Sequence, residues 1–328
     1  MDVRGTPRSP AVDLAGTKLF AWHGLSCRIP EGWDPTSVTG TDREGYFSFD
    51  DERARRLEIK YARARRWRQP ALEKTLEYYF HTVQKKLKKG MAFDVEYDVK
   101  LIGAERIPSS YEYRTYGWTS DFVARGIIWK CPVCRRVVIA QALAVPNRVN
   151  YREMADVLTS VRCHADGDAQ VWAAFEFAVE VPKRFLLDLY RLQAGLISLS
   201  FIGRNERLVV DRIGMAHAVL KHTPMDHYVA NIHYKKLRRR RLRFVEEPWR
   251  GHAGFRIEGE RLRLRYLLPG IGRIFLRWSK KDHIGGRLWH CPAANRLFVV
   301  RAEGKGAREL ADSIAATIVC HAGNGSNE

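Results

Sequence analysis

The sequence predicts an α+β protein made of two tandem duplicated units, each a mainly antiparallel sheet covered by a long helix and a closing helix. Two observations carry this prediction. Motifs of the first half return in the second half, and each half alternates strand-like segments with two segments whose apolar residues have helical spacing. With 328 residues, the chain is long enough to bury one core in each unit.

Two segments show the repeat most clearly. WKCPVCRRVVIA (129–140) is matched by WHCPAANRLFVV (289–300), and REMADVLTSVRCHA (152–165) is matched by RELADSIAATIVCHA (308–322), which has one extra residue. The repeat and the composition of the segments between its copies predict four parts of the chain. These are a flexible arm over 1–16, a first unit over 17–166, a second unit over 167–322 and a tail over 323–328.

The elements expected in the first unit run from strands to helices. They are a strand over 18–30, a hairpin over 46–62, a long helix over 70–90, two strands over 126–145 and a closing helix over 151–165. Pro30 ends the first strand, Pro70 suits a first helical turn, and Gly90 closes the long helix. The hairpin turns around Asp50 and Asp51, between two runs of alternating polarity.

The second unit repeats this order. Its expected elements are a strand over 171–182, a hairpin over 195–214, a long helix over 224–243, strands over 250–268 and 273–280, a Cys-Pro segment over 286–304 and a closing helix that ends at 321. The hairpin turns around Gly203, and the long helix begins at Pro224.

The segment IPEGW, from Ile29 to Trp33, follows a strand and precedes a hairpin and a helix. This order resembles the PsbP/Mog1-like α/β/α sandwich, although VPKRF in the second copy lacks both the Gly and the Trp. The resemblance implies two sandwich units in tandem. It also implies a non-enzymatic adaptor more readily than a catalyst, because that fold carries unrelated binding and assembly roles.

The charge balance favours a polyanionic partner. The chain has 56 Lys and Arg against 37 Asp and Glu, a net charge of +19. An arginine-rich proteome with solvated basic faces is the alternative explanation. No apolar run is long enough to span a bilayer, and the N-terminal segment lacks the apolar region of a secretory signal, so a cytoplasmic protein without a transmembrane segment is expected.

The cysteines are duplicated with the units. Cys131 matches Cys291, and Cys163 matches Cys320, so the members of each pair Cys131–Cys163 and Cys291–Cys320 are expected to meet in the fold. Three interpretations remain open: a disulfide in each unit, a zinc site, or small buried thiols. The zinc site would use Cys131, Cys134, Cys163 and His164. Because Ala294 stands where the first unit has Cys134, the second unit would retain at most three ligands. No other cofactor is expected.

Basic residues cluster at the ends of the two long helices and on strand-like segments. One or two cations satisfy a helix C-terminus, so a larger cluster indicates a polyanion, and arginines near aromatic rings suit phosphate contact with base stacking. A solvated sheet face with cation–π pairs is the alternative. The predicted nucleic-acid contacts are Lys235, Lys236, Arg238, Arg239, Arg240, Arg241, Arg243, Arg261, Arg263, Arg265, Arg63, Arg65, Arg66, Lys85 and Lys86.

These features together predict a non-enzymatic module that binds RNA or DNA with weak sequence preference and associates with ribosomes or chromatin. A scaffold for an acidic protein partner is the first alternative. A metal-dependent hydrolase with its site near His164 or His321 is the second, although no complete catalytic signature occurs in the sequence.

Overall fold

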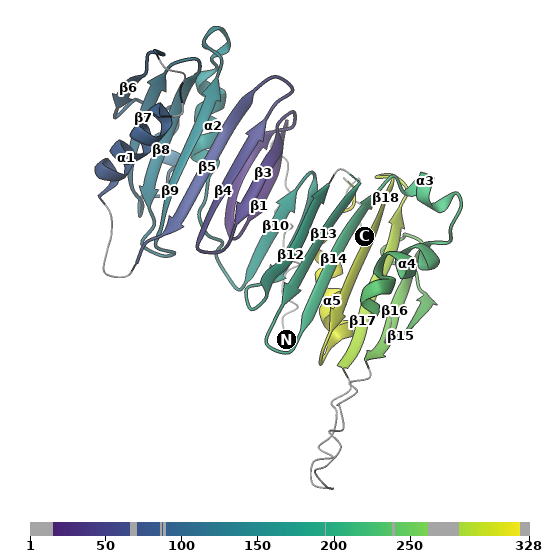
Figure 1. The fold of residues 1–328 in the computed structure, drawn as a ribbon. Helices are drawn as coiled ribbons and strands as arrows, with labels where there is room; N and C mark the ends of the chain where they lie inside the picture. Colours follow the sequence, from purple (N-terminus) through teal and green to yellow (C-terminus); the bar gives the residue numbers. More distant parts are fainter. Residues whose placement is uncertain are drawn as a thin grey trace, which may run out of the picture. The chain divides into compact units, whose positions relative to one another are not determined.

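The computed structural model describes residues 16–65, 71–85, 87, 90–193, 195–237, 240–261 and 282–321 (Figure 1). Its contacts divide the chain into unit 1, Met1–Glu176, and unit 2, Phe177–Glu328. The sequence predicted the boundary between residues 166 and 167, ten residues before the one in the structure. The strand Ala169–Ala174 (β10) therefore belongs to unit 1. Among the described residues, no helix is both long and apolar enough to cross a membrane.

Unit 1 begins with the hairpin of β1 (Thr17–Trp22) and β2 (Leu25–Pro30). His23 and Gly24 form its tight loop at positive φ, 50° and 82°, as a two-residue hairpin loop requires. Strand β10 pairs with β1, with Ala173 opposite Ala21. A seven-stranded antiparallel sheet follows, in the order β3 (Asp34–Gly40), β4 (Glu44–Asp50), β5 (Arg55–Arg63), β9 (Arg136–Ala144), β8 (Val123–Lys130), β7 (Glu112–Thr119) and β6 (Asp94–Tyr97).

Two helices pack on this sheet. Helix α1 (Leu72–Gln84) contacts β7 and β8, and α2 (Tyr151–Ser160) contacts β2, β8 and β9. Leu76 and Phe80 of α1 lie in a core cluster with Tyr116 and Ile128 of the sheet. Short 3-10 turns lie at Ala104–Arg106 (η1) and Pro146–Arg148 (η2).

Unit 2 opens with β11 (Phe177–Pro182) and continues into its own seven-stranded antiparallel sheet. The order is β12 (Leu186–Gln193), β13 (Leu196–Ile202), β14 (Arg207–Gly214), β18 (Arg296–Glu303), β17 (Asp282–Cys291), β16 (Gly254–Arg261) and β15 (Arg240–Glu246). Adding nine to each strand number of unit 1 reproduces this order, so the two sheets share one topology.

The helices of unit 2 are α3 (Ala216–Leu220), α4 (Met225–Leu237) and α5 (Ala307–Thr317). Val229 of α4 packs with Leu288 and Val299 of the sheet. Helix α5 contacts β11, β17 and β18, and Ala311 and Ile314 are buried on its apolar face.

The expected fold class, an α+β protein with helix-covered sheets, is wrong. The protein is mostly β, with 50% strand and 20% helix, and the described strands of each unit include a seven-stranded antiparallel sheet. The long helices end at Gln84 and Leu237. Residues 240–243, expected to end the second long helix, lie in β15 instead, because all seven residues of β15 pair with β16 and gain the hydrogen bonds of a ladder. Tertiary pairing overrides the helical propensity of the arginine-rich segment.

Candidate metal centres

The first centre starts at the turn between β8 and β9. Arg135 takes positive φ, 58°, and the turn closes through hydrogen bonds from Arg135 N to Cys131 O (2.9 Å) and from Cys131 N to Arg136 O (3.0 Å). The backbone N–H groups of Cys134 and Arg136 donate to the sulfurs of Cys131 and Cys134, respectively. A Cys-Pro-Val-Cys turn of this kind presents two sulfurs from one short loop.

The other two donors follow helix α2. Arg162 exchanges backbone hydrogen bonds with Ser26 of β2 (2.8 Å each), and Ser160 Oγ accepts from the backbone N of Arg28 (2.9 Å). The buried Arg136 guanidinium donates to Cys163 O (2.7 Å). These bonds fix the end of α2 against β2, and they place Cys163 and His164 opposite the turn.

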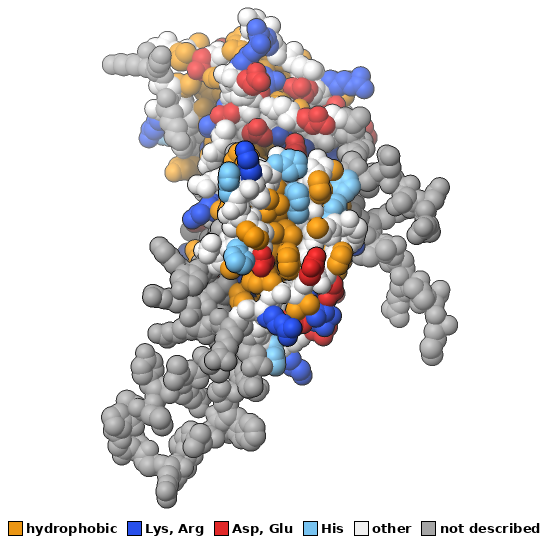
Figure 2. Space-filling model, turned by 90° about the vertical axis from the view of Figure 1, so that its right-hand side faces the viewer, with side chains coloured by type: hydrophobic (Ala, Val, Ile, Leu, Met, Phe, Trp, Pro, Cys, Tyr) orange, Lys and Arg blue, Asp and Glu red, His pale blue; other side chains and the backbone are white. Residues whose placement is uncertain are grey.

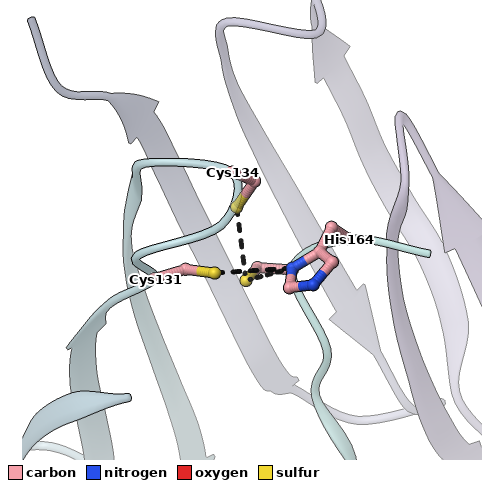
Figure 3. A group of neighbouring side chains, drawn as sticks. Cys131, Cys134 and His164 are labelled. Carbon is pink, nitrogen blue, oxygen red and sulfur yellow. Dashed lines mark hydrogen bonds between the residues drawn. The ribbon is translucent and has the colours of Figure 1, made fainter. Parts of the chain in front are cut away.

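The four donors of unit 1 converge on one point, as Figure 3 shows for the labelled Cys131, Cys134 and His164. His164 Nδ1 lies 3.4 Å from Cys131 Sγ and 3.5 Å from Cys163 Sγ, and the sulfurs of Cys134 and Cys163 are 3.5 Å apart. All four donor atoms lie within 4.8 Å of one another. Asp166 Oδ1 is 3.9 Å from Nε2 of His164, the ring nitrogen that faces away from the sulfurs.

Unit 2 contains a second convergent group, with donors from Cys291, Cys320, His321 and His252. His321 Nδ1 lies 3.3 Å from Cys291 Sγ and 3.2 Å from Cys320 Sγ, and His252 Nε2 lies 3.2 Å from Cys320 Sγ. Thr317 Oγ1 accepts from the backbone N of Glu180 (3.1 Å), as Ser160 accepts from Arg28 in unit 1.

Strand register explains how His252 enters the second group. Tyr113 lies opposite Trp129 in the β7–β8 pair, and Gly254 lies opposite Trp289 in the β16–β17 pair. His252, two residues before Gly254, therefore corresponds to Tyr111, two residues before Tyr113. Tyr111 is already at the first centre, where its hydroxyl lies 3.2 Å from Cys163 Sγ.

Burial makes the thiols poor acids without a cation. It raises the pKa of Cys131 and raises that of Cys320 to about 11. The hydrogen bond with Cys134, together with burial, raises the pKa of Cys163 to about 12, and the same contact with Cys163 lowers the pKa of Cys134. A bound divalent cation reverses this balance, because a coordinating thiol is deprotonated outright.

The donor geometry suits a tetrahedral ion. In a tetrahedral site, zinc bonds of roughly 2.3 Å to sulfur and 2.0–2.1 Å to nitrogen place neighbouring donors about 3.3–3.8 Å apart. The donor pairs in contact are 3.2–3.5 Å apart, and all four donors of each centre lie within 4.8 Å of one another. Each centre offers four protein donors, three sulfurs and one nitrogen in unit 1 and two of each in unit 2. Four protein ligands are typical of structural zinc, whereas catalytic zinc keeps a position for water or substrate.

The expectations for the cysteines have different outcomes. Cys131 lies beside Cys163 and Cys291 beside Cys320, but all six cysteines are free, so neither expected disulfide is formed. The first donor set is the one expected from the sequence. His252 was missed, because no motif spacing links it to the cysteines and only the strand register does.

Eight of the eleven histidines lie in unit 2, since only His23, His81 and His164 precede Phe177. Histidine side chains gather on the face that Figure 2 shows. Two of the histidines of unit 2, His252 and His321, are donors of its centre.

The predicted nucleic-acid contacts do not form one described surface. Arg65, Lys85 and Arg243 are exposed, and Arg63 is exposed with its guanidinium 3.8 Å from Asp42. For another set the backbone is placed but the side chains lie outside the description: Lys235 and Lys236 on α4, Arg240 and Arg241 on β15, and Arg261 at the end of β16. A third set lies wholly outside the described residues: Arg66, Lys86, Arg238, Arg239, Arg263 and Arg265.

Other hairpin arginines are paired with acids. Arg55 contacts Asp50 and Glu58, and Arg56 contacts Glu153. On the face that Figure 2 shows, some Lys and Arg side chains lie beside Asp and Glu side chains. The described arginines of this hairpin thus include several that stabilise the fold.

No family model matches the chain, and no curated protein matches it. Two solved structures of the immunity protein TplEi of the T6SS from Pseudomonas aeruginosa are similar over most of the chain. The apo structure has a TM-score of 0.35 at 11% identity and covers 93% of this chain and 97% of its own. The complex with an "L" peptide has a TM-score of 0.33 at 8% identity and covers 93% and 98%.

Proposed function

We propose that this protein is a non-enzymatic, zinc-stabilised binding module with one structural zinc ion in each unit. The convergence of four Cys and His donors in each of the two units carries the proposal. In unit 1 the ion would join the β8–β9 turn to the end of α2 through Cys131, Cys134, Cys163 and His164. In unit 2 it would join Cys291, at the end of β17, to Cys320 and His321, with His252 as the fourth ligand.

Zinc is favoured over other divalent ions by the donor types. Thiolate and imidazole together suit zinc, whereas magnesium, calcium and manganese prefer oxygen donors. The hydroxyl of Tyr111 beside Cys163 and the carboxylate of Asp166 beside His164 are outer-shell partners of the kind that orient metal ligands. Because both donor sets are complete, the proposal assigns the ions to stability and not to catalysis.

Metal content of purified protein tests this function. Elemental analysis should find two zinc ions per wild-type chain and one in each of the variants Cys131→Ser and Cys291→Ser. Cys27→Ala is the matched control, because Cys27 is a buried thiol of β2 outside both groups and should leave two ions in place. A wild-type chain without zinc after growth and purification in its presence contradicts the proposal.

Polyanion binding is the second candidate function. It is supported by the net charge of +19 and by the exposed Arg243 on β15, beside Arg240 and Arg241 in the sequence. The partner would be RNA, DNA or a ribonucleoprotein in a cytoplasmic setting, and an acidic protein surface is the alternative partner of the same charge. Contacts to phosphate would give little sequence preference.

A further inference from the structure

The two centres connect different numbers of chain segments. In unit 1 the four donors come from two short segments, Cys131–Cys134 in the β8–β9 turn and Cys163–His164 after α2. In unit 2 the β17–β18 turn supplies only Cys291, and the missing donor comes from His252, in the connection between β15 and β16. A metal ion in unit 2 therefore joins three segments.

The third segment has a defined geometry. Trp249 and His252 exchange backbone hydrogen bonds, N to O at 2.9 and 3.0 Å, around Arg250 and Gly251. Both central residues take positive φ, 49° and 76°, which is the pattern of a tight two-residue hairpin loop. This loop presents the imidazole of His252 to Cys320, which follows α5, with the rings of His252 and His321 5.3 Å apart.

The corresponding place in unit 1 has a weaker connection. Tyr111 occupies the position of His252 and reaches Cys163 through a hydrogen bond of 3.2 Å. Its ring also stacks on Trp129 at 5.8 Å. This connection requires no ion, so loss of metal from unit 1 would leave it available.

Unit 2 also has contacts that would keep its hairpin folded without the ion. Arg287 donates to Asp312 of α5 (2.6 Å) and to Glu247 (2.5 Å), and its guanidinium lies 4.7 Å from the Trp249 ring. These contacts hold Glu247 and Trp249, which follow β15, to β17 and α5. The link from its turn to the segment after α5 passes through His252.

We propose that the ion of unit 2 clamps the β15–β16 turn to the end of α5, so that metal release loosens this turn, whereas the ion of unit 1 has no such effect on the Tyr111 segment. The proposal rests on the proposed zinc function. Among the described strands, β15 is one of the two edge strands of its sheet, and β12 is the other. Metal occupancy would therefore control the state of a sheet edge, the part of a sheet that is open to pairing with another chain.

Hydrogen exchange measured by mass spectrometry on the full chain tests the clamp. Zinc-loaded wild type is compared with chelator-treated wild type, His252→Ala, His252→Cys and the matched control Tyr111→Phe, with zinc content measured in each sample. We expect amides of residues 247–254 to exchange at least about tenfold faster after chelation and in His252→Ala, because a local opening no longer breaks a metal bond. Peptides around Tyr111 should change by less than about twofold on chelation.

His252→Cys should keep two ions and wild-type protection, because a thiolate can replace the imidazole as a ligand. If chelation removes both ions but residues 247–254 exchange as in the loaded protein, the clamp is wrong while the zinc function stands. Equal loosening of the Tyr111 segment and of residues 247–254 on chelation also overturns it. If the loaded wild type contains no zinc, the proposed function itself fails. Because chelation requires no substitution, the test does not depend on the folding of any variant.

Discussion

Tyr111 and His252 occupy equivalent places beside a Cys-His pair, and Cys134 and Ala294 occupy equivalent places in the two Cys-Pro turns. The two units share three donors, two cysteines and one histidine. The fourth donor is Cys134 in unit 1 and His252 in unit 2. The exchange keeps the number of donors at four while changing one sulfur for one nitrogen. A replacement of one donor by another is expected if each unit needs four ligands for a tetrahedral ion.

The equivalence of the two donor positions can be tested by removing the donor at position 134 and adding one at position 111. Cys134→Ala should weaken zinc binding in unit 1 by more than the roughly 10–100-fold that loss of an outer-shell partner costs. Adding Tyr111→His should restore much of that affinity by recreating the donor set of unit 2. Competition with a chromophoric chelator measures both variants. A double variant that binds no more tightly than Cys134→Ala would show that the two positions are not interchangeable.

His23 gives a pH-dependent stability that is separate from the metal donors. Burial, aided by the charge of Arg136, lowers its pKa from 6.5 to about 4. The folded state therefore binds fewer protons than the unfolded state between about pH 4 and 6.5, so the free energy of unfolding should fall as the pH drops through this range. The loss should reach on the order of 3 kcal/mol.

The variant His23→Phe isolates this effect, because Phe175 occupies the matching hairpin loop between β10 and β11 at nearly the same φ, 51° against 50°. Chemical denaturation at pH 7, 6, 5 and 4 should give a steeper loss for wild type than for the variant. Acid effects on the metal centres are common to both proteins. Parallel pH profiles would show that His23 does not titrate as described.

At the scale of elements, the helix that closes each unit is fixed by its end. Ser160 in unit 1 and Thr317 in unit 2 accept a backbone hydrogen bond from the strand beside the helix, β2 or β11. The Cys-His pair follows each of these residues at a distance of three or four positions. The same bond thus orients the helix and places two of the candidate metal donors.

Removing this bond should destabilise unit 1. Ser160→Ala removes the hydrogen bond from the Arg28 N–H to Ser160 Oγ, which should cost roughly 0.5–1.5 kcal/mol of unfolding free energy. Thr82→Ala is the control, because the Thr82 hydroxyl bonds only within α1, to Tyr78 O at 2.9 Å, on an exposed face. Urea denaturation compares the two variants, and equal losses would remove the special role of Ser160.

The duplication alone predicted that Cys131 meets Cys163 and that Cys291 meets Cys320, because residues retained in both copies share one place in the fold. Hairpins such as β4–β5 and β13–β14 were also foreseen from alternation and turn residues. The strand β15 was not foreseen, since the Arg-rich residues 240–243 were expected to end the long helix and only pairing with β16 makes them part of a strand. His252 depends on that same pairing, so it could not be predicted before the register was known.

At the scale of the whole molecule, two units with one strand order each contain one Cys/His centre, and the chain carries a net charge of +19. The centres belong to the duplicated architecture. Each long helix is followed by a basic run, 85–89 in unit 1 and 235–243 in unit 2, and the run in unit 2 is the longer of the two. Stability and partner binding are therefore assigned to different parts of the chain.

Changing Arg240, Arg241 and Arg243 together to Ala tests polyanion binding. If these side chains contact phosphates, affinity for RNA and DNA should fall about equally for all sequences. The slope of log K against log[salt] should also flatten by about 0.7–0.9 for each lost contact. Mobility-shift titrations over a salt series measure both quantities, with thermal unfolding as the check on folding. If the variant keeps the affinity of the wild type, nucleic acid is bound by other residues. If the wild type itself shows no salt-dependent binding of nucleic acid, an acidic protein is favoured as the partner.

X-ray absorption at the zinc edge of the purified full chain tests the central claim most directly. The two centres together offer five sulfurs and three nitrogens. With both sites filled, the average shell per ion should thus be about 2.5 sulfurs near 2.3 Å and 1.5 nitrogens near 2.0–2.1 Å. His252→Ala should lose the unit 2 ion and move the average toward three sulfurs and one nitrogen. A shell of oxygen donors, or an average unchanged in His252→Ala and in Cys131→Ser, would contradict the assignment of one structural zinc ion to each unit.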